Sequence, residues 1–254
     1  MLAVLGASVP DSLQKAVSAQ GFAKILLPPH PGLPEPVCTH PDMLLFFAPD
    51  GIFCTESYVR VAKEVLARIS GLTGLPILPV PEEYGPAYPK DILFNSALVG
   101  TVLYCNATHT AKRITEHPGF RVVPVRQGYA KCSVIPVGSD ALMTGDPSIA
   151  AAAEAVGQAV LRLPVGGIRL SGYPFGFWGG SASFAPFGGV HTIYFCGNYR
   201  RQAGADQIEA FCRARGFDCV SLTEEVLTDY GTMFLLPCAA EMAGTDRKQR
   251  QIQI

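Results

Sequence analysis

The chain has little charge and no excess of either sign. Charged residues make up 16% of its 254 residues, and 20 Lys and Arg stand against 21 Asp and Glu. A nucleic-acid-binding protein needs a surplus of positive charge, so we expect no nucleic-acid partner. A disordered chain needs low hydrophobicity and high net charge, which a hydrophobic fraction of 48% and a net charge of -1 exclude.

Several motifs are also missing. No apolar run approaches the ~20 residues of a membrane span, and the N-terminal Met-Leu-Ala-Val-Leu-Gly lacks the positive charge of a signal peptide. The eight cysteines include no Cys-x-x-Cys pair, and no Gly-x-Gly-x-x-Gly or P-loop pattern occurs. We therefore expect a cytoplasmic protein with reduced thiols, no metal, no cofactor and no membrane contact. The sequence indicates nothing about its oligomeric state.

Glycine and proline are abundant, at 26 and 21 residues, and they separate a recurring pattern. An amphipathic helical stretch is followed by a short apolar strand five times. The predicted helices are Asp11–Gln20, Tyr58–Ser70, Ala111–His117, Pro147–Val156 and Ala205–Arg215. The predicted strands are Ala23–Leu27, Ile77–Val80, Arg121–Val125, Ala159–Leu163 and Asp218–Leu222. Such self-similarity with a period of roughly 49 residues is typical of a repeat architecture.

A hairpin follows each of the first four strands. The predicted hairpins pair Met43–Phe47 with Ile52–Cys54, Ile92–Leu98 with Thr101–Cys105, Cys132–Val137 with Ala141–Thr144, and Ser181–Phe184 with His191–Cys196. The last strand, Gly231–Leu236, has no second strand after it to complete a hairpin. The N-terminal strand Leu2–Leu5 can take that place. We therefore expect one domain, residues 1–254, folded as a five-fold pseudosymmetric α/β propeller, a closed ring of ββαβ-type units. An open α/β sheet is the alternative. The segment from Asp246 to Ile254 is predicted to be a flexible end.

The first strand of each hairpin would line the centre of such a ring, so polar residues just before these strands are candidates for binding a ligand. They are Asp42, Asp91, Lys131, Trp178 and Asp229, together with Asn95 inside the second of these strands. Two carboxylates near one another can hold a planar guanidinium by paired hydrogen bonds. Each charge has a plain alternative, since it can mark an exposed strand end, and Trp178 can be a core residue.

Three residues are candidates for catalysis. Cys132 follows Lys131, and a neighbouring cation favours the reactive thiolate. Adjacent residues of a strand point to opposite faces, however, so Cys132 would face away from the axis if Lys131 faces it. Cys238 lies in a loop after the last strand, and His40 is the better placed general base among the five histidines.

Five short strings carry a resemblance to a known superfamily. They are Pro-Pro-His-Pro (28–31), His-Pro-Asp-Met (40–43), Tyr-Pro-Lys-Asp (88–91), Gln-Gly-Tyr-Ala-Lys-Cys-Ser (127–133) and Gly-Phe-Trp-Gly-Gly (176–180). With the five repeats, they make the chain resemble the pentein superfamily of guanidino-group-modifying enzymes, in particular an uncharacterised bacterial branch. The resemblance implies acidic residues near the axis that hold a guanidinium, and a nucleophilic Cys late in the chain aided by a His of the fourth unit.

The chain departs from that pattern at three places. Lys131-Cys132-Ser133 replaces the third-unit Gly-Gly-Asp/Asn segment, Trp178-Gly179-Gly180-Ser181 stands at the place of the fourth-unit His, and Cys238 comes three residues late. We therefore expect a protein that binds a small guanidino-type or other polar metabolite in a central pocket. Such a protein can also be a hydrolase whose catalytic residues have been rearranged. A non-catalytic binding protein on the same fold is the alternative. Whether the chain is an enzyme stays open.

Overall fold

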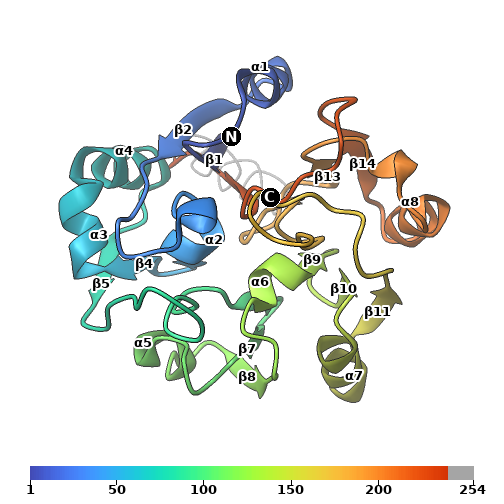
Figure 1. Cartoon of the computed structure of the whole chain (residues 1–254). Coiled ribbons are helices and arrows are strands. Elements are labelled where there is room, and N and C mark those ends of the chain that lie inside the picture. Colours follow the sequence, from blue (N-terminus) through green and yellow to red (C-terminus); the bar gives the residue numbers. More distant parts are fainter. Residues whose placement is uncertain (240–254) are drawn as a thin grey trace, which may run out of the picture.

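A computed structural model describes residues 1–239, in which the strands form five separate sheets, and none of these sheets closes on itself. Three sheets share one plan: an antiparallel hairpin, then a third strand parallel to its second. They are β3 (Phe46–Ala48), β4 (Gly51–Thr55) and β5 (Ile77–Val80); β6 (Ala97–Val99), β7 (Val102–Cys105) and β8 (Arg121–Pro124); and β9 (Val134–Pro136), β10 (Ala141–Thr144) and β11 (Ala159–Arg162). Figure 1 shows the sheets set around a centre with helices on the outside. The fold is a mixed α/β fold, as expected.

The chain ends meet in the fourth of these sheets, in the order β12-β15-β1-β2. Its strands are β12 (Ser183–Phe184), β15 (Met233–Leu236), β1 (Leu2–Gly6) and β2 (Ala23–Leu27). The predicted pairing of the last strand with the N-terminal one is confirmed: β15 and β1 are antiparallel, with Leu236 opposite Leu2. Every residue of both strands is buried, which explains why the sequence is continuously apolar there.

The predicted hairpin of the fourth unit is wrong in its pairing. β12 pairs in parallel with β15, while β13 (Thr192–Phe195) pairs in parallel with β14 (Asp218–Ser221). Between β12 and β13 the ladder is reduced to a single bridge between Ala182 and Phe195. The Ser183 hydroxyl accepts the Tyr194 N–H at 2.9 Å, and so replaces the carbonyl that a regular ladder would use.

Three long helices lie close to their predicted positions: α1 (Asp11–Ala19), α7 (Pro147–Ala155) and α8 (Ala205–Arg213). The predicted helix Tyr58–Ser70 is two helices, α3 (Glu56–Val61) and α4 (Lys63–Thr73), separated at the buried Ala62. The predicted helix Ala111–His117 is a single turn, α5 (Lys112–Thr115). Short 3-10 turns occur at η1 (Glu35–Val37) and η2 (Tyr199–Arg201).

Strands at the centre begin later than predicted, because the residues before them form helical turns. Pro41–Leu44 form α2 and Ala130–Ser133 form α6, so the following strands begin at Phe46 and Val134. Pro41 occupies the first turn of α2, where its missing N–H and fixed φ cost nothing. The candidate residues Asp42, Lys131 and Cys132 therefore lie on helical turns rather than on strands.

Within residues 1–239, no helix combines the length and apolar character that a membrane crossing requires. The segment expected to be a flexible tail, residues 246–254, lies outside the described residues.

Candidate functional site

Seven polar side chains gather at the centre of the molecule, at the end where the chain enters the central strands. They are His40, Asp42, Asn95, Lys131, Cys132, Asp229 and Thr232, and none is more than 4% exposed. The helical turns α2 and α6, which carry Asp42, Lys131 and Cys132, lie near the centre in Figure 1. Buried polar groups of this kind must be paired within the protein or with a ligand.

Asn95 organises the turn that carries Lys131 and Cys132. Its Oδ1 accepts the backbone N–H of Lys131 at 2.8 Å and that of Cys132 at 3.1 Å. Its Nδ2 contacts the Cys132 Sγ at 3.0 Å. The expectation that strand alternation turns Cys132 away from the axis is wrong, because successive residues of a helical turn are about 100° apart rather than 180°.

Asp42 accepts two hydrogen bonds on one oxygen. Its Oδ2 lies 3.1 Å from the Cys132 Sγ and 2.7 Å from the Thr232 hydroxyl. Its Oδ1 is buried and has no hydrogen-bond partner among the described residues. Burial raises the pKa of Asp42, an effect that the His40 imidazole partly opposes. Burial, with the charges of Asp42 and Asp229, also raises the pKa of the Cys132 thiol well above its ordinary value.

Thr232 joins Asp42 to Lys131. The Lys131 ammonium lies 3.2 Å from the Thr232 hydroxyl and 3.2 Å from the Val134 carbonyl oxygen. Burial lowers the pKa of Lys131 to about 8. Thr232 has φ of 67°, a rare conformation for a β-branched residue, and such strain is typical of functional sites. Sequence reasoning missed Thr232, since nothing in its sequence neighbourhood indicates either the strain or the contact.

Asp229 and His40 form the other half of the cluster. The Asp229 oxygens accept the backbone N–H groups of Gly231 and Phe177, each at 2.9 Å, and the His40 Nδ1 is 3.9 Å from Oδ1. Burial raises the pKa of Asp229 to about 6 and lowers that of His40. A side chain at Gly231, which has φ of 75°, would collide with His40, so this close approach requires glycine.

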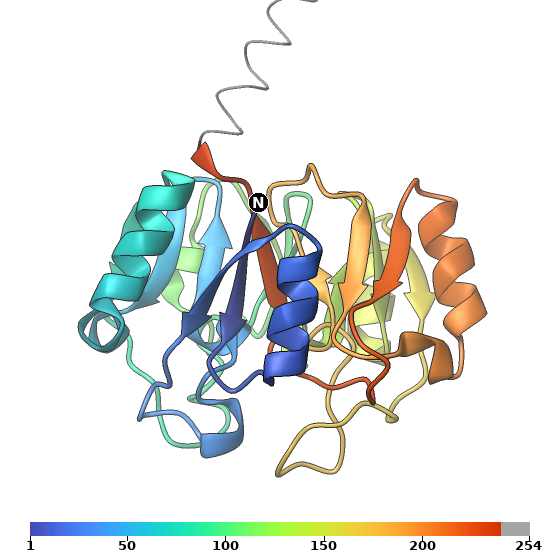
Figure 2. The same ribbon diagram turned by 90° about the horizontal axis from the view of Figure 1, so that it is seen from above.

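A cavity of about 220 Å³ opens above three of these side chains, His40, Cys132 and Asp229. Its remaining wall is mostly aromatic. We call four of its rings the aromatic collar: Tyr129, Tyr173, Phe175 and Phe177. The last three belong to the long loop between β11 and β12, which projects beyond the strands in Figure 2. Tyr129 and Phe177 lie inside the strings 127–133 and 176–180, whereas Tyr173 and Phe175 had no sequence signal for function.

Three predicted site residues lie outside the cluster. Asp91 is beside the cavity, where its Oδ2 accepts the Tyr129 hydroxyl at 2.8 Å, and burial raises its pKa. Trp178 donates its Nε1 hydrogen to the Pro164 carbonyl and borders a separate cavity of about 260 Å³. Cys238 follows β15 at the end opposite Thr232, packed against the core beside α4 and β2, roughly 20 Å along the strand at ~3.3 Å per residue.

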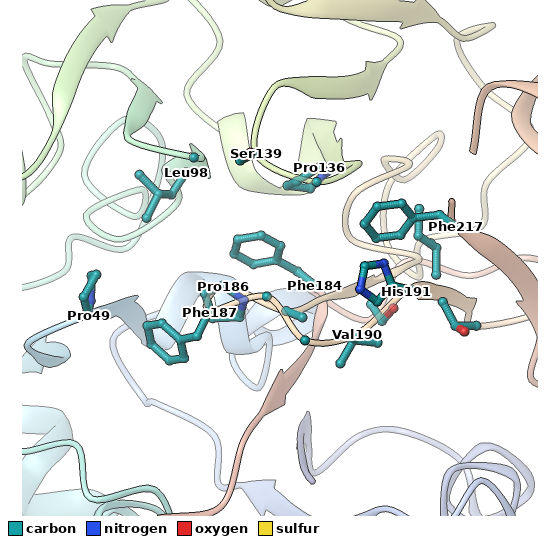
Figure 3. A pocket seen from close by; sticks show the side chains of 18 residues that line it. Pro49, Leu98, Pro136, Ser139, Phe184, Pro186, Phe187, Val190, His191 and Phe217 are labelled. Atoms are coloured by element: carbon teal, nitrogen blue, oxygen red, sulfur yellow. The ribbon is translucent and has the colours of Figure 1, made fainter. Parts of the chain in front are cut away.

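A larger cavity, of about 610 Å³, lies at the opposite end of the central strands, among the hairpin turns (Figure 3). Phe184, Phe187, His191 and Phe217 contribute rings to it, and no acidic residue, lysine or arginine of residues 1–239 lines it. Size alone does not make it the candidate site, because no cysteine, carboxylate, lysine or arginine of residues 1–239 lines it. Residues 1–239 also hold no group of three His, Cys, Asp or Glu side chains arranged for a metal ion.

Comparisons with known proteins agree with this picture of the fold. Residues 4–234 match the model of a family of unknown function, DUF6873. No curated protein matches the chain. Among solved structures, it is similar to a dimethylarginine dimethylaminohydrolase (DDAH) from Pseudomonas aeruginosa, a cysteine-to-serine mutant complexed with citrulline, at 11% identity and a TM-score of 0.50.

A second DDAH structure, the adduct of a histidine-to-glycine variant with S-methyl-L-thiocitrulline, is 12% identical with a TM-score of 0.51. Each alignment covers 88% of this chain and 92% of the DDAH chain. Identity this low carries the fold and not the activity. The chain therefore belongs to the DUF6873 family and has the fold of the pentein superfamily, of which DDAH is a member.

Proposed function

We propose that the chain binds a small metabolite with a cationic guanidinium or amidinium head in the cavity above His40, Cys132 and Asp229. The charge of the cavity floor is the observation that carries this proposal. Two buried carboxylates, Asp42 and Asp229, stand against the single ammonium of Lys131, and His40 stays neutral because burial lowers its pKa. With both carboxylates ionised, the floor has a negative charge that a cation would balance.

Hydrogen bonding supports the same ligand class. The Asp42 Oδ1 is a buried acceptor without a partner among residues 1–239, and such groups are rare outside functional sites. Guanidinium and amidinium groups carry only donors, in a planar arrangement that suits carboxylate oxygens. Asp229 faces the cavity, and Asp42 lies directly behind the Cys132 thiol.

A hydrolase with rearranged catalytic residues fits this geometry. In it the Cys132 thiol proton passes to the Asp42 Oδ2, 3.1 Å away, and Sγ attacks the central carbon of the amidinium. One C–N bond breaks, and the departing nitrogen takes the proton from Asp42. Water then loses a proton to His40 and forms a C–O bond as the C–S bond breaks, and the departing sulfur takes that proton from His40, which restores the thiol. Cys238 has no part in this scheme.

The alternative is a binding protein without catalysis, and one observation favours it. The raised pKa of Cys132 keeps the thiol protonated at neutral pH, whereas thiol enzymes usually lower that pKa. The hydrolase therefore requires Asp42 to be ionised when the ligand is bound. For the hydrolase and for the binding protein alike, we propose that the five sheets form one domain with five-fold pseudosymmetry. The cavity then lies at one end of the axis of this domain.

The binding proposal predicts that Asp42→Asn removes affinity for small guanidinium ions. Methylguanidine should bind wild-type protein in a ligand-observed NMR titration, and the variant should bind at least about tenfold more weakly, because it removes one of the two buried negative charges beneath the cavity. Asp50→Asn, at an aspartate 57% exposed, is the matched control and should bind normally. Equal binding by wild type and Asp42→Asn would contradict the proposal.

The position of Cys132 predicts charge-directed alkylation. The cation 2-chloroacetamidine should alkylate Cys132 at least about tenfold faster than the neutral 2-chloroacetamide, because Asp229 draws the cation into the cavity. In both reactions an S–C bond forms and chloride leaves, so the two reagents differ chiefly in charge. Mass spectrometry of digested protein identifies the site, and Cys132→Ser is the control. Equal rates for the two reagents would leave the cavity floor without the negative charge proposed for it.

A further inference from the structure

The wall of the cavity above its floor is apolar and aromatic. Within the aromatic collar, the rings of Tyr129 and Phe177 are 6.0 Å apart and those of Phe175 and Phe177 are 6.3 Å apart. Leu170 and Pro174 complete this side of the cavity. Rings at these distances pack against one another and form a continuous apolar surface. Such a surface can bury a flat or alkyl group of a ligand, and the ring faces attract cations.

The same wall offers no positive charge to a carboxylate. No lysine or arginine of residues 1–239 lines the cavity, and the Lys131 ammonium is turned toward Val134 and Thr232 behind Cys132. A carboxylate at the collar would also lie close to Asp91, which accepts a hydrogen bond from Tyr129. Two neighbouring carboxylates repel one another, so a ligand carboxylate is disfavoured beside Asp91.

Three backbone donors of the loop are already in use. The N–H of Tyr173 donates to Leu170, that of Gly176 to Ile168, and that of Phe177 to Asp229. Pro174 has no N–H to offer. A free amino acid such as arginine needs donors for its α-carboxylate, and no positively charged donor of residues 1–239 lines this wall.

We infer that the ligand is a small cation joined to an uncharged alkyl or aryl body, without a carboxylate. This inference rests on the proposed function, because it assumes that the cationic head meets Asp229. The cationic head occupies the floor, and the body lies within the aromatic collar. A cavity of about 220 Å³ is smaller than the ~300–1,000 Å³ of typical ligand pockets, so the body has the size of one ring or a short alkyl chain.

Three compounds test the inference in ligand-observed NMR titrations of the whole chain: methylguanidine, benzylguanidine and arginine. Benzylguanidine should bind at least about tenfold more tightly than methylguanidine, because its ring is removed from water when it packs against the aromatic collar. Arginine should bind no more tightly than methylguanidine. Arginine binding more tightly than benzylguanidine would overturn the inference while leaving the proposed function standing. If none of the three compounds binds, the proposed function and the inference fall together.

Two loop variants locate the effect. Tyr173 and Phe175 are 40% and 41% exposed, so Tyr173→Ala and Phe175→Ala should fold normally. Each should weaken benzylguanidine binding about three- to tenfold and leave methylguanidine binding unchanged, because only the body meets the collar. Val165→Ala, at a residue 69% exposed and outside this cavity, is the control. Benzylguanidine affinity that neither collar variant changes would contradict the inference.

Discussion

Lys131→Met should lower the free energy of unfolding by about 3–5 kcal/mol at pH 7.5, the usual result of removing one member of a buried charged group. The ammonium of Lys131 is 2% exposed and is joined to Asp42 through the Thr232 hydroxyl. Without it, Asp42 and Asp229 keep their burial but lose the positive charge that stabilises their ionised forms. Denaturant unfolding followed by circular dichroism measures the difference.

The pH dependence of this loss identifies its cause. In Lys131→Met the pKa values of Asp42 and Asp229 rise further, so the variant should fall further below wild type as the pH rises from 5 to 8. Adding Asp42→Asn to Lys131→Met should cost less than the sum of the two single changes, because the residues interact. Lys63→Met, at an exposed lysine of α4, should stay within about 0.5 kcal/mol of wild type. A loss that is the same at pH 5 and pH 8 would point to packing rather than charge.

Asp229→Asn should change how stability depends on pH. The pKa of Asp229 is raised from 3.8 to about 6 by burial, so the folded state binds the proton more tightly than the unfolded state. This contribution to wild-type stability is fully present below pH 3.8 and is lost as the pH rises through about 6. The gap between these pKa values corresponds to about 3 kcal/mol.

The variant lacks this titration, so its stability relative to wild type should improve by about 3 kcal/mol between pH 4 and pH 7. At every pH it should carry a constant loss, because its amide replaces one of the oxygens that accept the N–H groups of Phe177 and Gly231. The measurement is a series of urea unfolding curves at fixed ionic strength. Asp140→Asn, at an exposed aspartate, should show a flat difference across the same range. A flat difference for Asp229→Asn as well would mean that Asp229 is not held at a raised pKa.

Periodicity in the sequence was enough to predict most elements of the fold. The helices α1, α7 and α8 and the strands β2 and β5 lie within two residues of their predicted limits. Local signals explain this success: Asp146 accepts the N–H groups of Ser148 and Ile149 at the start of α7, and Pro147 occupies its first turn. The pairing of β1 with β15 was predictable because β15 was the only predicted strand near the centre that had no hairpin partner in the sequence.

The errors arose where distant segments override local preference. The predicted strand began at Cys132, but Asn95, 36 residues before Lys131, holds Ala130–Ser133 as a helical turn. Strand alternation was therefore the wrong rule for Cys132. β12 joins β15 rather than β13 for a similar reason, since parallel pairing between distant strands leaves no mark on either sequence.

The sequence by itself determined the mixed α/β fold and singled out six of the seven clustered residues, because periodic patterns and charges beside apolar strands are local properties. Only the tertiary structure decided which candidates meet. It placed Asp42, Lys131, Cys132 and Asp229 together with Thr232, and it left Trp178 and Cys238 outside. It also covered the site with an aromatic loop. The physical reason is that contacts such as the one between Asp42 and Thr232, which are 190 residues apart, depend on how the units pack around the centre and not on any local pattern.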